Sequence, residues 1–313
     1  MPIHLNLPEP VQWTLLGIFA ALALSSLGLL LLRRLKPNTD FTQVGLRIRT
    51  WWLMAGIFTT AIVIGPVVSI VFFAFVSFMA FKEYISLIPT RRADRRVLFW
   101  AYLAIPMQYW FVHTAWYGMF IVFIPVYAFL LLPMRMIAIG DTTGFLKAIG
   151  TLHWGLMTTV FSISHLAFLL ALPPEGNVAG GAGLILFLVI LTQSNDVSQF
   201  LWGKSFGKRK IVPTVSPNKT WAGFLGGVFN TVVLALLLSG LLTPMLLHHA
   251  AAAGVLIAVS GFFGDTVISA VKRDIGVKDS GDLLPGHGGI LDRVDSLTYT
   301  APLFFHFIHW FYY

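Results

Sequence analysis

Cysteine is absent from this 313-residue chain, which excludes disulfide bridges, thiolate zinc sites and cysteine nucleophiles. Charge is also scarce, because 11% of the residues are Asp, Glu, Lys or Arg while 57% are hydrophobic. A composition this apolar argues against a soluble globular chain and indicates a polytopic membrane protein. With thiols excluded, we expect any metal to be bound by oxygen ligands.

Apolar runs long enough to cross a bilayer, about 20 residues each, recur along the chain and predict an all-α fold. Gly65-Pro66 should divide the run 51–80 into two helices joined by a tight turn. We expect a polar connector at 135–150 and a short loop at His248-His249. The sequence shows no repeat or linker, so we expect one membrane domain over 1–313, with 1–180 as scaffold and 181–296 holding the catalytic motifs. The predicted spans are 12–32, the two halves of 51–80, 97–112, 116–132, 155–172, 181 onward, 222–242, 250–272 and 297–313.

The net charge of +8 is distributed in a way that predicts topology. Assigning alternate connections to opposite sides puts all 21 Lys and Arg residues on one side. The positive-inside rule makes that side cytoplasmic, with about ten transmembrane helices and both termini on the other side. The basic residues in question lie in the connections 33–49, 82–96, 135–147, 204–219 and 272–293. We expect the arginines of 82–96 to be topology anchors; binding of anionic lipid is the alternative.

Acidic residues concentrate in one segment, because residues 264–296 hold six aspartates although the chain has only 13 acidic residues. If this segment continues a helix from 251–263, Asp265, Ser269 and Lys272 fall at i, i+4 and i+7 on one face, with Arg273 beside them. Such a face places a carboxylate close to a pair of cations. A solvated loop with charges at helix ends is the alternative.

The glycine-rich stretch 286–289 follows, and glycines allow a backbone to approach a ligand closely. Asp292 and Asp295 then lie at i and i+3, on one face if the chain is helical from Ile290 onward. Grouped carboxylates next to cations and a glycine loop suit a divalent cation that holds a phosphate.

A second polar segment interrupts the apolar run 183–192, where Asn195 and Asp196 occur between Gln193 and Gln199. Such residues at membrane depth are costly unless they face a water-filled cavity or one another, so they indicate a site. The basic stretch that follows, 203–220, contains Ser216 and Lys219 and suits a loop that contacts phosphates. A basic loop that only sets topology would look similar.

The pattern from Ser269 to Asp295, S-x-V-K-R-x4-K-D-x-G-x2-L-P-G-H-G-G-I-L-D-R-V-D, closely resembles the C-terminal signature of the CDP-diacylglycerol synthases, also called phosphatidate cytidylyltransferases. The stretch SPNKTWAGF at 216–224, preceded by Asn195-Asp196, resembles the family's second conserved region. Members of the family usually have Glu where this chain has Ala222, which leaves open the role of that carboxylate in metal binding or loop ordering.

The resemblance implies that CTP and phosphatidate react to give CDP-diacylglycerol and pyrophosphate. Since the phosphate of phosphatidate is already a nucleophile, no Ser, His or Cys triad is required, and the task of the site is to overcome repulsion between phosphates. The family uses Mg²⁺, with a second cation as an option. The implied partners are CTP, phosphatidate and membrane lipids, without nucleic acid and with a homodimer as one form of assembly. The implied location is a bacterial inner membrane, with the site facing the cytoplasm.

The resemblance also implies roles for individual residues. The first metal ligands are Asp265 and Asp292, followed by Asp295 and Asp196, while Lys272 and Arg273 contact substrate phosphates. His287 either donates to a phosphate or holds the glycine loop. The full set of expected substrate-binding residues is Asn195, Ser216, Lys219, Ser269, His287 and Arg293.

Two alternatives stay open. A transporter would line a midplane pathway with charges in corresponding broken helices of two halves, and the sequence shows no such pair. Another CTP-dependent lipid enzyme, such as a polyprenol kinase or the archaeal-lipid cytidylyltransferase, would share a metal and nucleotide site. We expect such an enzyme to lack the full pattern from Ser269 to Asp295.

Overall fold

The computed structural model describes residues 7–88, 95–138, 140–173, 176, 178–281, 283, 286 and 288–313. Within these ranges the chain is helical and forms no β-strand, apart from an isolated bridge between Lys210 and Thr220. The predicted all-α class is therefore confirmed for the described part of the chain. The α-helices are α1 (Glu9–Leu35), α2 (Thr42–Ile64), α3 (Pro66–Leu87), α4 (Arg95–His113), α5 (Tyr117–Val122), α6 (Phe129–Ile137), α7 (Phe145–Leu156), α8 (Ser162–Leu169), α9 (Gly180–Phe206), α10 (Trp221–Leu242), α11 (Leu247–Ile275), α12 (Leu291–Val294) and α13 (Leu297–Tyr312).

Two short π-helical segments connect helices into longer rods. The segment η2 (Phe123–Ala128) joins α5 to α6, and η3 (Met157–Phe161) joins α7 to α8. In η2, Pro125 cannot donate to the helix ladder, and a π-bulge absorbs such a break. In η3, Thr159 donates its hydroxyl to the Gly155 carbonyl oxygen at 2.7 Å, a contact that commonly bends helices.

Seven of the described helices are long and apolar enough to cross a membrane, counting 117–137 and 145–169 as single helices. Spanning segments must satisfy their backbone groups internally, which a helix does. The protein is therefore a polytopic membrane protein, as predicted. The helices α2, α4 and α13 fall outside this set of seven.

Several predicted boundaries are wrong. The predicted connector 135–150 is shorter, because α6 continues to Ile137 and α7 begins at Phe145. His248 and His249 lie in the first turn of α11 and not in a loop, and His249 Nδ1 lies 2.6 Å from the Tyr312 hydroxyl. The reason is common to both cases: helices continue past the apolar run into the interface, where polar side chains are solvated.

The tight turn predicted at Gly65-Pro66 is confirmed. The helix α2 ends at Ile64, and α3 begins at Pro66, which is suited to the first position of a helix. Gly65 adopts a φ of 135°, a conformation that side-chain-bearing residues rarely adopt. The Ser69 hydroxyl donates to the Ala61 carbonyl oxygen at 2.9 Å and closes the turn.

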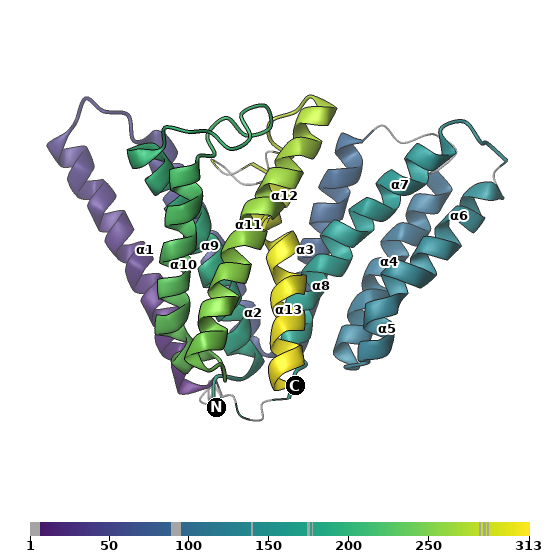
Figure 1. Cartoon of the computed structure of the whole chain (residues 1–313), viewed down its shortest axis with the longest axis horizontal. Coiled ribbons are helices and arrows are strands. Elements are labelled where there is room, and N and C mark those ends of the chain that lie inside the picture. The colour runs from purple at the N-terminus through teal and green to yellow at the C-terminus, as the bar shows by residue number, and fades with distance from the viewer. Residues whose placement is uncertain are drawn as a thin grey trace.

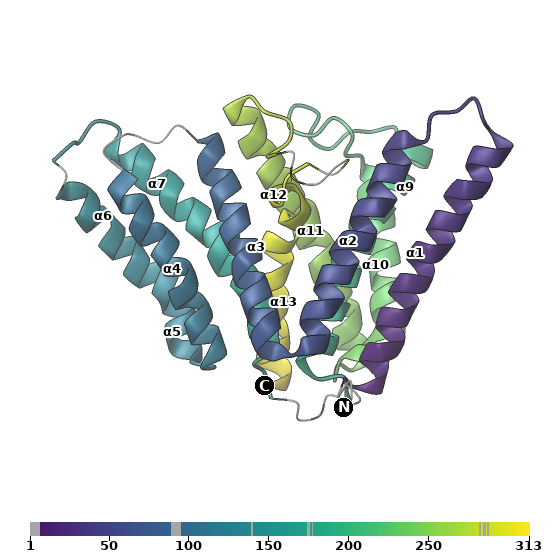
Figure 2. The same cartoon turned by 180° about the vertical axis from the view of Figure 1, so that it is seen from behind.

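The beginning of α1 and the end of α13 lie at the same end of the bundle (Figure 1). The connections that follow α1, α6, α9 and α11 lie at the opposite end, as both views show (Figures 1 and 2). The interior contains α8, of which every residue is buried, and the early part of α9, where residues 183–188 are buried. The opposite end, with its connections, is where the polar motifs gather.

Close packing of α10 on α9 depends on glycines. A Cβ at Gly223 would lie 2.5 Å from the Gln199 carbonyl oxygen, and one at Gly227 would lie 2.5 Å from the Gln199 Cγ. Small residues allow such close approach between membrane helices. The α9–α10 pair therefore forms a rigid base for the polar residues of α9.

Candidate functional site

Three carboxylates from separate segments of the chain meet at the end of the bundle where the basic connections lie. We call Asp196 of α9, Asp265 of α11 and Asp295, which lies between α12 and α13, the acidic cluster. Their charges interact with one another, and the Ser296 hydroxyl lies 3.2 and 3.0 Å from the two carboxylate oxygens of Asp196. The structure thus brings together residues that are 99 positions apart in the chain.

Gly264 makes this meeting possible. A Cβ at this position would lie 2.6 Å from the Asp295 carbonyl oxygen and 3.1 Å from the Ser296 Cα. Contacts that close exclude a side chain. The absence of one lets the backbone before α13 lie directly against α11, next to Asp265.

Lys219, from the α9–α10 connection, is the cation bonded directly to the cluster. Its Nζ forms an ion pair with Asp265 Oδ2 at 2.7 Å, donates to Gln199 Oε1 at 2.8 Å and lies 5.3 Å from the ring centre of Phe262. The Ser269 hydroxyl donates to Asp265 Oδ1 at 3.2 Å, so the predicted common face of Asp265 and Ser269 is confirmed. In the contacts described, the Lys219 ammonium is thus bonded to one of the three grouped acids.

Among the described residues, the acidic cluster has more carboxyl groups than directly bonded cations. Burial raises the pKa of Asp295 well above its usual range, and the charges of Asp265 and Asp196 raise it further. The Arg293 guanidinium opposes this effect only partly, and its buried Nε has no hydrogen-bond partner. A cation added near these oxygens would relieve the repulsion.

The hydrogen-bond partners of Asp292 differ from those of the acidic cluster. Its Oδ1 accepts a hydrogen bond from Lys272 Nζ at 2.7 Å, and its Oδ2 accepts from the backbone N–H groups of Ser280 and Gly289 at 2.8 and 3.0 Å. Burial alone would raise the pKa of Asp292, yet these hydrogen bonds and the Lys272 charge outweigh it and lower the pKa. Asp292 and Lys272 are only 6% and 9% exposed, so they form a buried ion pair.

A further carboxylate, Glu83 of α3, was not recognised in the sequence. Its Oε1 accepts from the Ile290 N–H at 2.9 Å, while its Oε2 accepts from the Leu291 N–H at 2.8 Å and the Ser280 hydroxyl at 3.2 Å. We call Glu83 and Asp292 the loop anchor, because together they bind both ends of the segment 280–291. The sequence signal for Glu83 was its position as a lone carboxylate near the end of an apolar helix. The arginines that follow it obscured this signal.

Asp292 and Asp295, which the sequence predicts on one helix face, have different hydrogen-bond partners. The helix α12 ends at Val294 after four residues, and Asp295 lies between α12 and α13. Asp295 Oδ1 accepts from the Ser296 N–H at 2.7 Å, so the two carboxylates have different partners. Of the four predicted carboxylates, three lie together in the acidic cluster, and the fourth, Asp292, belongs to the loop anchor.

The other predicted substrate-binding residues that the structure describes differ in their contacts. Asn195 is buried between helices, with its amide bonded to the Ala258 carbonyl oxygen at 3.2 Å and to the Thr231 hydroxyl at 3.3 Å. Arg273 is exposed and donates to the carbonyl oxygens of Val215 and Val277. The Ser216 carbonyl oxygen accepts from the Lys219 N–H at 3.2 Å within a turn. His287 lies outside the described residues. The substrate roles of all these residues stay predictions.

The donor set suits a hard divalent cation in ligand type and charge, since it offers carboxylate oxygens with unrelieved repulsion. Among the residues that the structure describes, however, no group of three Asp, Glu, His or Cys side chains is arranged to enclose a metal. Mg²⁺ commonly takes one or two carboxylates and completes its shell with water and substrate phosphates. The cluster therefore fits an ion that is shared with a phosphate better than an ion held by protein alone.

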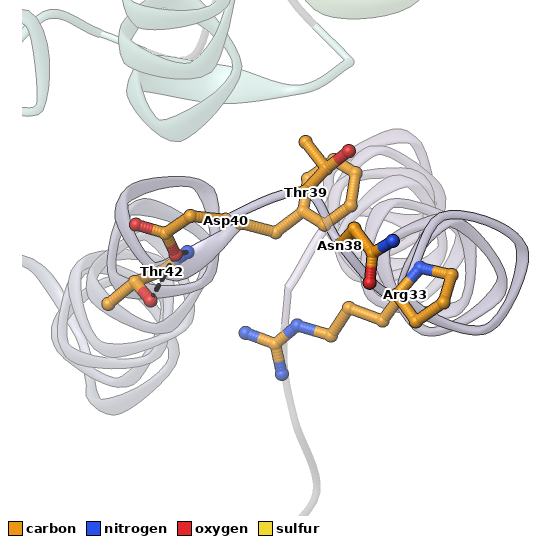
Figure 3. Close-up of a pocket in the computed structure, with 7 residues that line it drawn as sticks. Arg33, Asn38, Thr39, Asp40 and Thr42 are labelled. Atoms are coloured by element: carbon orange, nitrogen blue, oxygen red, sulfur yellow. Dashed lines mark hydrogen bonds between the residues drawn. The ribbon is translucent and has the colours of Figure 1, made fainter.

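An open pocket in the α1–α2 loop contains none of these residues (Figure 3). Arg33, Asn38 and Asp40 line it. Asp40 Oδ1 already accepts from the backbone N–H of Thr42 at 2.8 Å, just before α2. The one carboxylate of this pocket is thus already bonded within the loop, and the residues of the sequence motifs lie elsewhere.

Comparison with known proteins identifies the family of the chain. The sequence profile of the cytidylyltransferase family matches residues 45–311. The chain is 48% identical over 301 residues to the uncharacterized protein YnbB of Escherichia coli K12, a match that covers 96% of this chain and 99% of that protein.

Named enzymes match over a shorter region. The phosphatidate cytidylyltransferase of Haemophilus influenzae is 41% identical over 133 residues, which cover 41% of this chain and 46% of that enzyme. That of Mycobacterium tuberculosis H37Rv is 42% identical over 125 residues, covering 39% and 37%. The chain thus spans less than half the length of each of these named enzymes. The family match is incompatible with the transporter alternative, and this chain belongs to the cytidylyltransferase family of enzymes.

Proposed function

We propose that this enzyme transfers CMP from CTP to phosphatidate and releases pyrophosphate, with the acidic cluster and Lys219 at the reaction centre. The observation that carries the proposal is the convergence of Asp196, Asp265 and Asp295 beside a lysine at the basic end of a membrane bundle. The partial matches to named phosphatidate cytidylyltransferases support phosphatidate as the acceptor.

The reaction requires neutralisation of the negative charge on both reactants, and it does not require a protein nucleophile. An oxygen of the phosphatidate phosphate attacks the α-phosphorus of CTP, a new P–O bond forms, and the bond to the β-phosphate breaks as pyrophosphate leaves. Both reactants are anionic, so groups that bind phosphate oxygens lower the barrier. The Lys219 ammonium and the Arg273 guanidinium can bind phosphate oxygens. Lys219 belongs to the α9–α10 connection, and Arg273 contacts the same connection at Val215.

Mg²⁺ is the cation we assign to the acidic cluster, with Asp265, Asp196 and Asp295 as the residues that would hold it. When bound, it would supply Lewis-acid stabilisation of the phosphate charge. Lys219 neutralises Asp265 in the present arrangement and would be free to bind phosphate when a cation replaces it. Asp292 is assigned to the loop anchor, because one of its oxygens is paired with the buried Lys272 ammonium and the other accepts from two backbone N–H groups.

The membrane arrangement follows the distribution of charge. We assign each long rod, including α2, α4 and α13, to a crossing of a bacterial inner membrane, with both termini outside and the acidic cluster at the cytoplasmic face. A water-soluble nucleotide and a lipid headgroup at the inner leaflet could both reach a site there. Because the chain lacks cysteine, single cysteines at Asn38 and His248 can be labelled in intact cells with a membrane-impermeant maleimide. Labelling at His248 alone supports this orientation, and labelling at Asn38 alone reverses it.

The direct test is CMP transfer from labelled CTP by the purified protein in detergent. Labelled CDP-diacylglycerol should form with phosphatidate and Mg²⁺, and should not form when Mg²⁺ is chelated. Two alternative acceptors are tested in parallel. An ether-linked archaeal lipid phosphate is tested with the same CTP, and polyprenol with CTP labelled in its γ-phosphate, because a kinase transfers that phosphate and not CMP. Label in one of those products, with none in CDP-diacylglycerol, would reject phosphatidate as the substrate.

A further inference from the structure

We infer that Glu83 is a positioning residue for the acidic cluster: it holds α12 so that Asp295 faces Asp196 and Asp265. The importance of this role for turnover rests on the proposed function. The positional part of the inference rests on contacts alone. Glu83 belongs to α3, far from the motif segments in the sequence, and touches neither Asp295 nor the other acids of the cluster in the contacts described.

The contacts of Glu83 are specific to a carboxylate. Both oxygens are used, Oε1 by the Ile290 N–H and Oε2 by the Leu291 N–H and the Ser280 hydroxyl. The two backbone donors lie at the start of α12, where N–H groups have no partner inside the helix. An anion at this place satisfies those donors and interacts favourably with the helix end.

The surrounding backbone is shaped around the Glu83 carboxylate. A Cβ at Gly289 would collide with Glu83 Oε2 and with the Ser280 hydroxyl oxygen, and one at Gly281 would lie 3.4 Å from Glu83 Oε1. The glycines therefore let the segment close around the side chain. Asp292 binds the same segment from the other side through the N–H groups of Ser280 and Gly289.

The link from Glu83 to the cluster runs through a single short turn. Ile290 and Leu291, which Glu83 holds, lead through α12 into Asp295 and Ser296. Ser296 contacts Asp196 through its hydroxyl and Asp295 through its N–H. Since α12 has only four residues, a shift of its start moves these groups directly.

The helix that carries Glu83 is itself fixed to the scaffold. The hydroxyl of Tyr84, the next residue, donates to the Thr151 carbonyl oxygen at 2.9 Å, and Phe81 is fully buried. Glu83 thus transmits the position of α3 and α7 to the reaction centre. This gives the N-terminal half of the chain a role in the geometry of the site.

The test compares Glu83→Gln with Glu9→Gln, the same substitution at an exposed position at the opposite end of the bundle. Hydrogen exchange of the purified protein is followed by mass spectrometry over residues 288–298. Glu83→Gln should speed exchange at Ile290 and Leu291 and also at Ser296, while Glu9→Gln should leave all of these amides unchanged. Unchanged exchange at Ser296 in Glu83→Gln would overturn the inference, whether or not the protein transfers CMP.

The kinetic arm uses the CMP-transfer assay. Partners that orient site residues typically contribute 10- to 100-fold, so Glu83→Gln should lower kcat by about 10- to 100-fold, with the KM for CTP within about threefold of wild type. In an Asp295→Asn background the same change should have an effect of less than about threefold, because the residue it positions is gone. Full additivity of the two substitutions would overturn the inference. A wild type that transfers no CMP would reject the proposed function and leave the exchange result as the test of Glu83.

Discussion

The acidic cluster and the loop anchor lie at the same end of the molecule, and both are built from carboxylates. They differ in the hydrogen-bond and ion-pair partners of those carboxylates. In the loop anchor, each carboxylate oxygen of Glu83 and Asp292 accepts at least one hydrogen bond from the chain. In the acidic cluster, three carboxylates share one directly bonded lysine, the hydroxyls of Ser269 and Ser296 and the Ser296 N–H. Under the proposed function, the first arrangement is complete without a ligand, whereas the second takes a cation.

Under the proposed function, this difference separates structural from functional acids more clearly than sequence spacing does. A buried carboxylate that is fully bonded stabilises the fold, and removing it leaves its partner without compensation. A group of acids that repel one another costs stability, and is retained where a cation or substrate relieves the repulsion. Substitutions in the acidic cluster should therefore lower turnover and keep stability, whereas substitution of Asp292 in the loop anchor should mainly lower stability.

The largest effect is expected for Asp265→Asn. Loss of this ligand removes several kcal/mol of charge stabilisation, so turnover in the CMP-transfer assay should fall by about 10³-fold or more. The protein should remain folded, because the cluster loses one of its repelling charges. Asp274→Asn, an exposed aspartate further along the same helix, serves as the control and should keep normal turnover. Activity of Asp265→Asn within about tenfold of wild type would remove it from the ligand assignment.

A somewhat smaller loss, about 10²-fold, is expected for Asp196→Asn, together with a raised Mg²⁺ requirement. Asparagine keeps the size of the side chain and its hydrogen bond to Ser296, so yield and melting temperature should not fall. The measurement is CMP transfer per folded molecule across a Mg²⁺ series. A low yield with normal specific activity would mean that Asp196 serves helix packing.

For Asp292→Asn, the main effect should be on stability. The substitution leaves the buried Lys272 ammonium without its counter-charge, which costs about 3 kcal/mol. Thermal unfolding in detergent without nucleotide should show the loss, and adding Lys272→Gln should restore part of it by removing the unpaired charge. If Asp292→Asn lost activity with an unchanged melting temperature, Asp292 would return to the metal ligands and the two groups of acids would no longer differ.

The smallest effect is expected for Ala222→Glu. Ala222 lies in the first turn of α10, after the Thr220 cap, where a negative charge stabilises a helix by about 0.5 kcal/mol. The acidic cluster and the loop anchor are both formed without a carboxylate here, so turnover should stay within about threefold of wild type. A gain in turnover above tenfold would show that this position belongs to the reaction centre.

Local spacing predicted the parts of the site that lie on one regular helix. Asp265 and Ser269 lie on a common face because α11 is continuous through both, and their hydrogen bond follows from the i, i+4 spacing. The turn at Gly65-Pro66 was predicted for the same reason, since it depends on two adjacent residues with strong backbone preferences.

Tertiary contacts determine the parts of the site that local spacing did not predict. The i, i+3 spacing of Asp292 and Asp295 does not report their partners, which are Lys272 for Asp292 and the Ser296 N–H for Asp295. Glu83 lies 207 residues before Ile290, and no local pattern reports a contact across that separation. The boundaries at Phe145 and Leu247 were missed because hydropathy marks the apolar part of a helix and not its hydrogen-bonded ends.

The most direct test of the central claim is cation binding by the two groups of acids in the absence of turnover. Binding of Mn²⁺, a paramagnetic substitute for Mg²⁺, can be measured by electron paramagnetic resonance on purified wild type, Asp265→Asn and Asp292→Asn below their melting temperatures. We expect wild type and Asp292→Asn to bind Mn²⁺ with affinities within about threefold, and Asp265→Asn to bind at least about tenfold more weakly. Weak binding by Asp292→Asn with normal binding by Asp265→Asn would contradict the assignment of the cation to the acidic cluster.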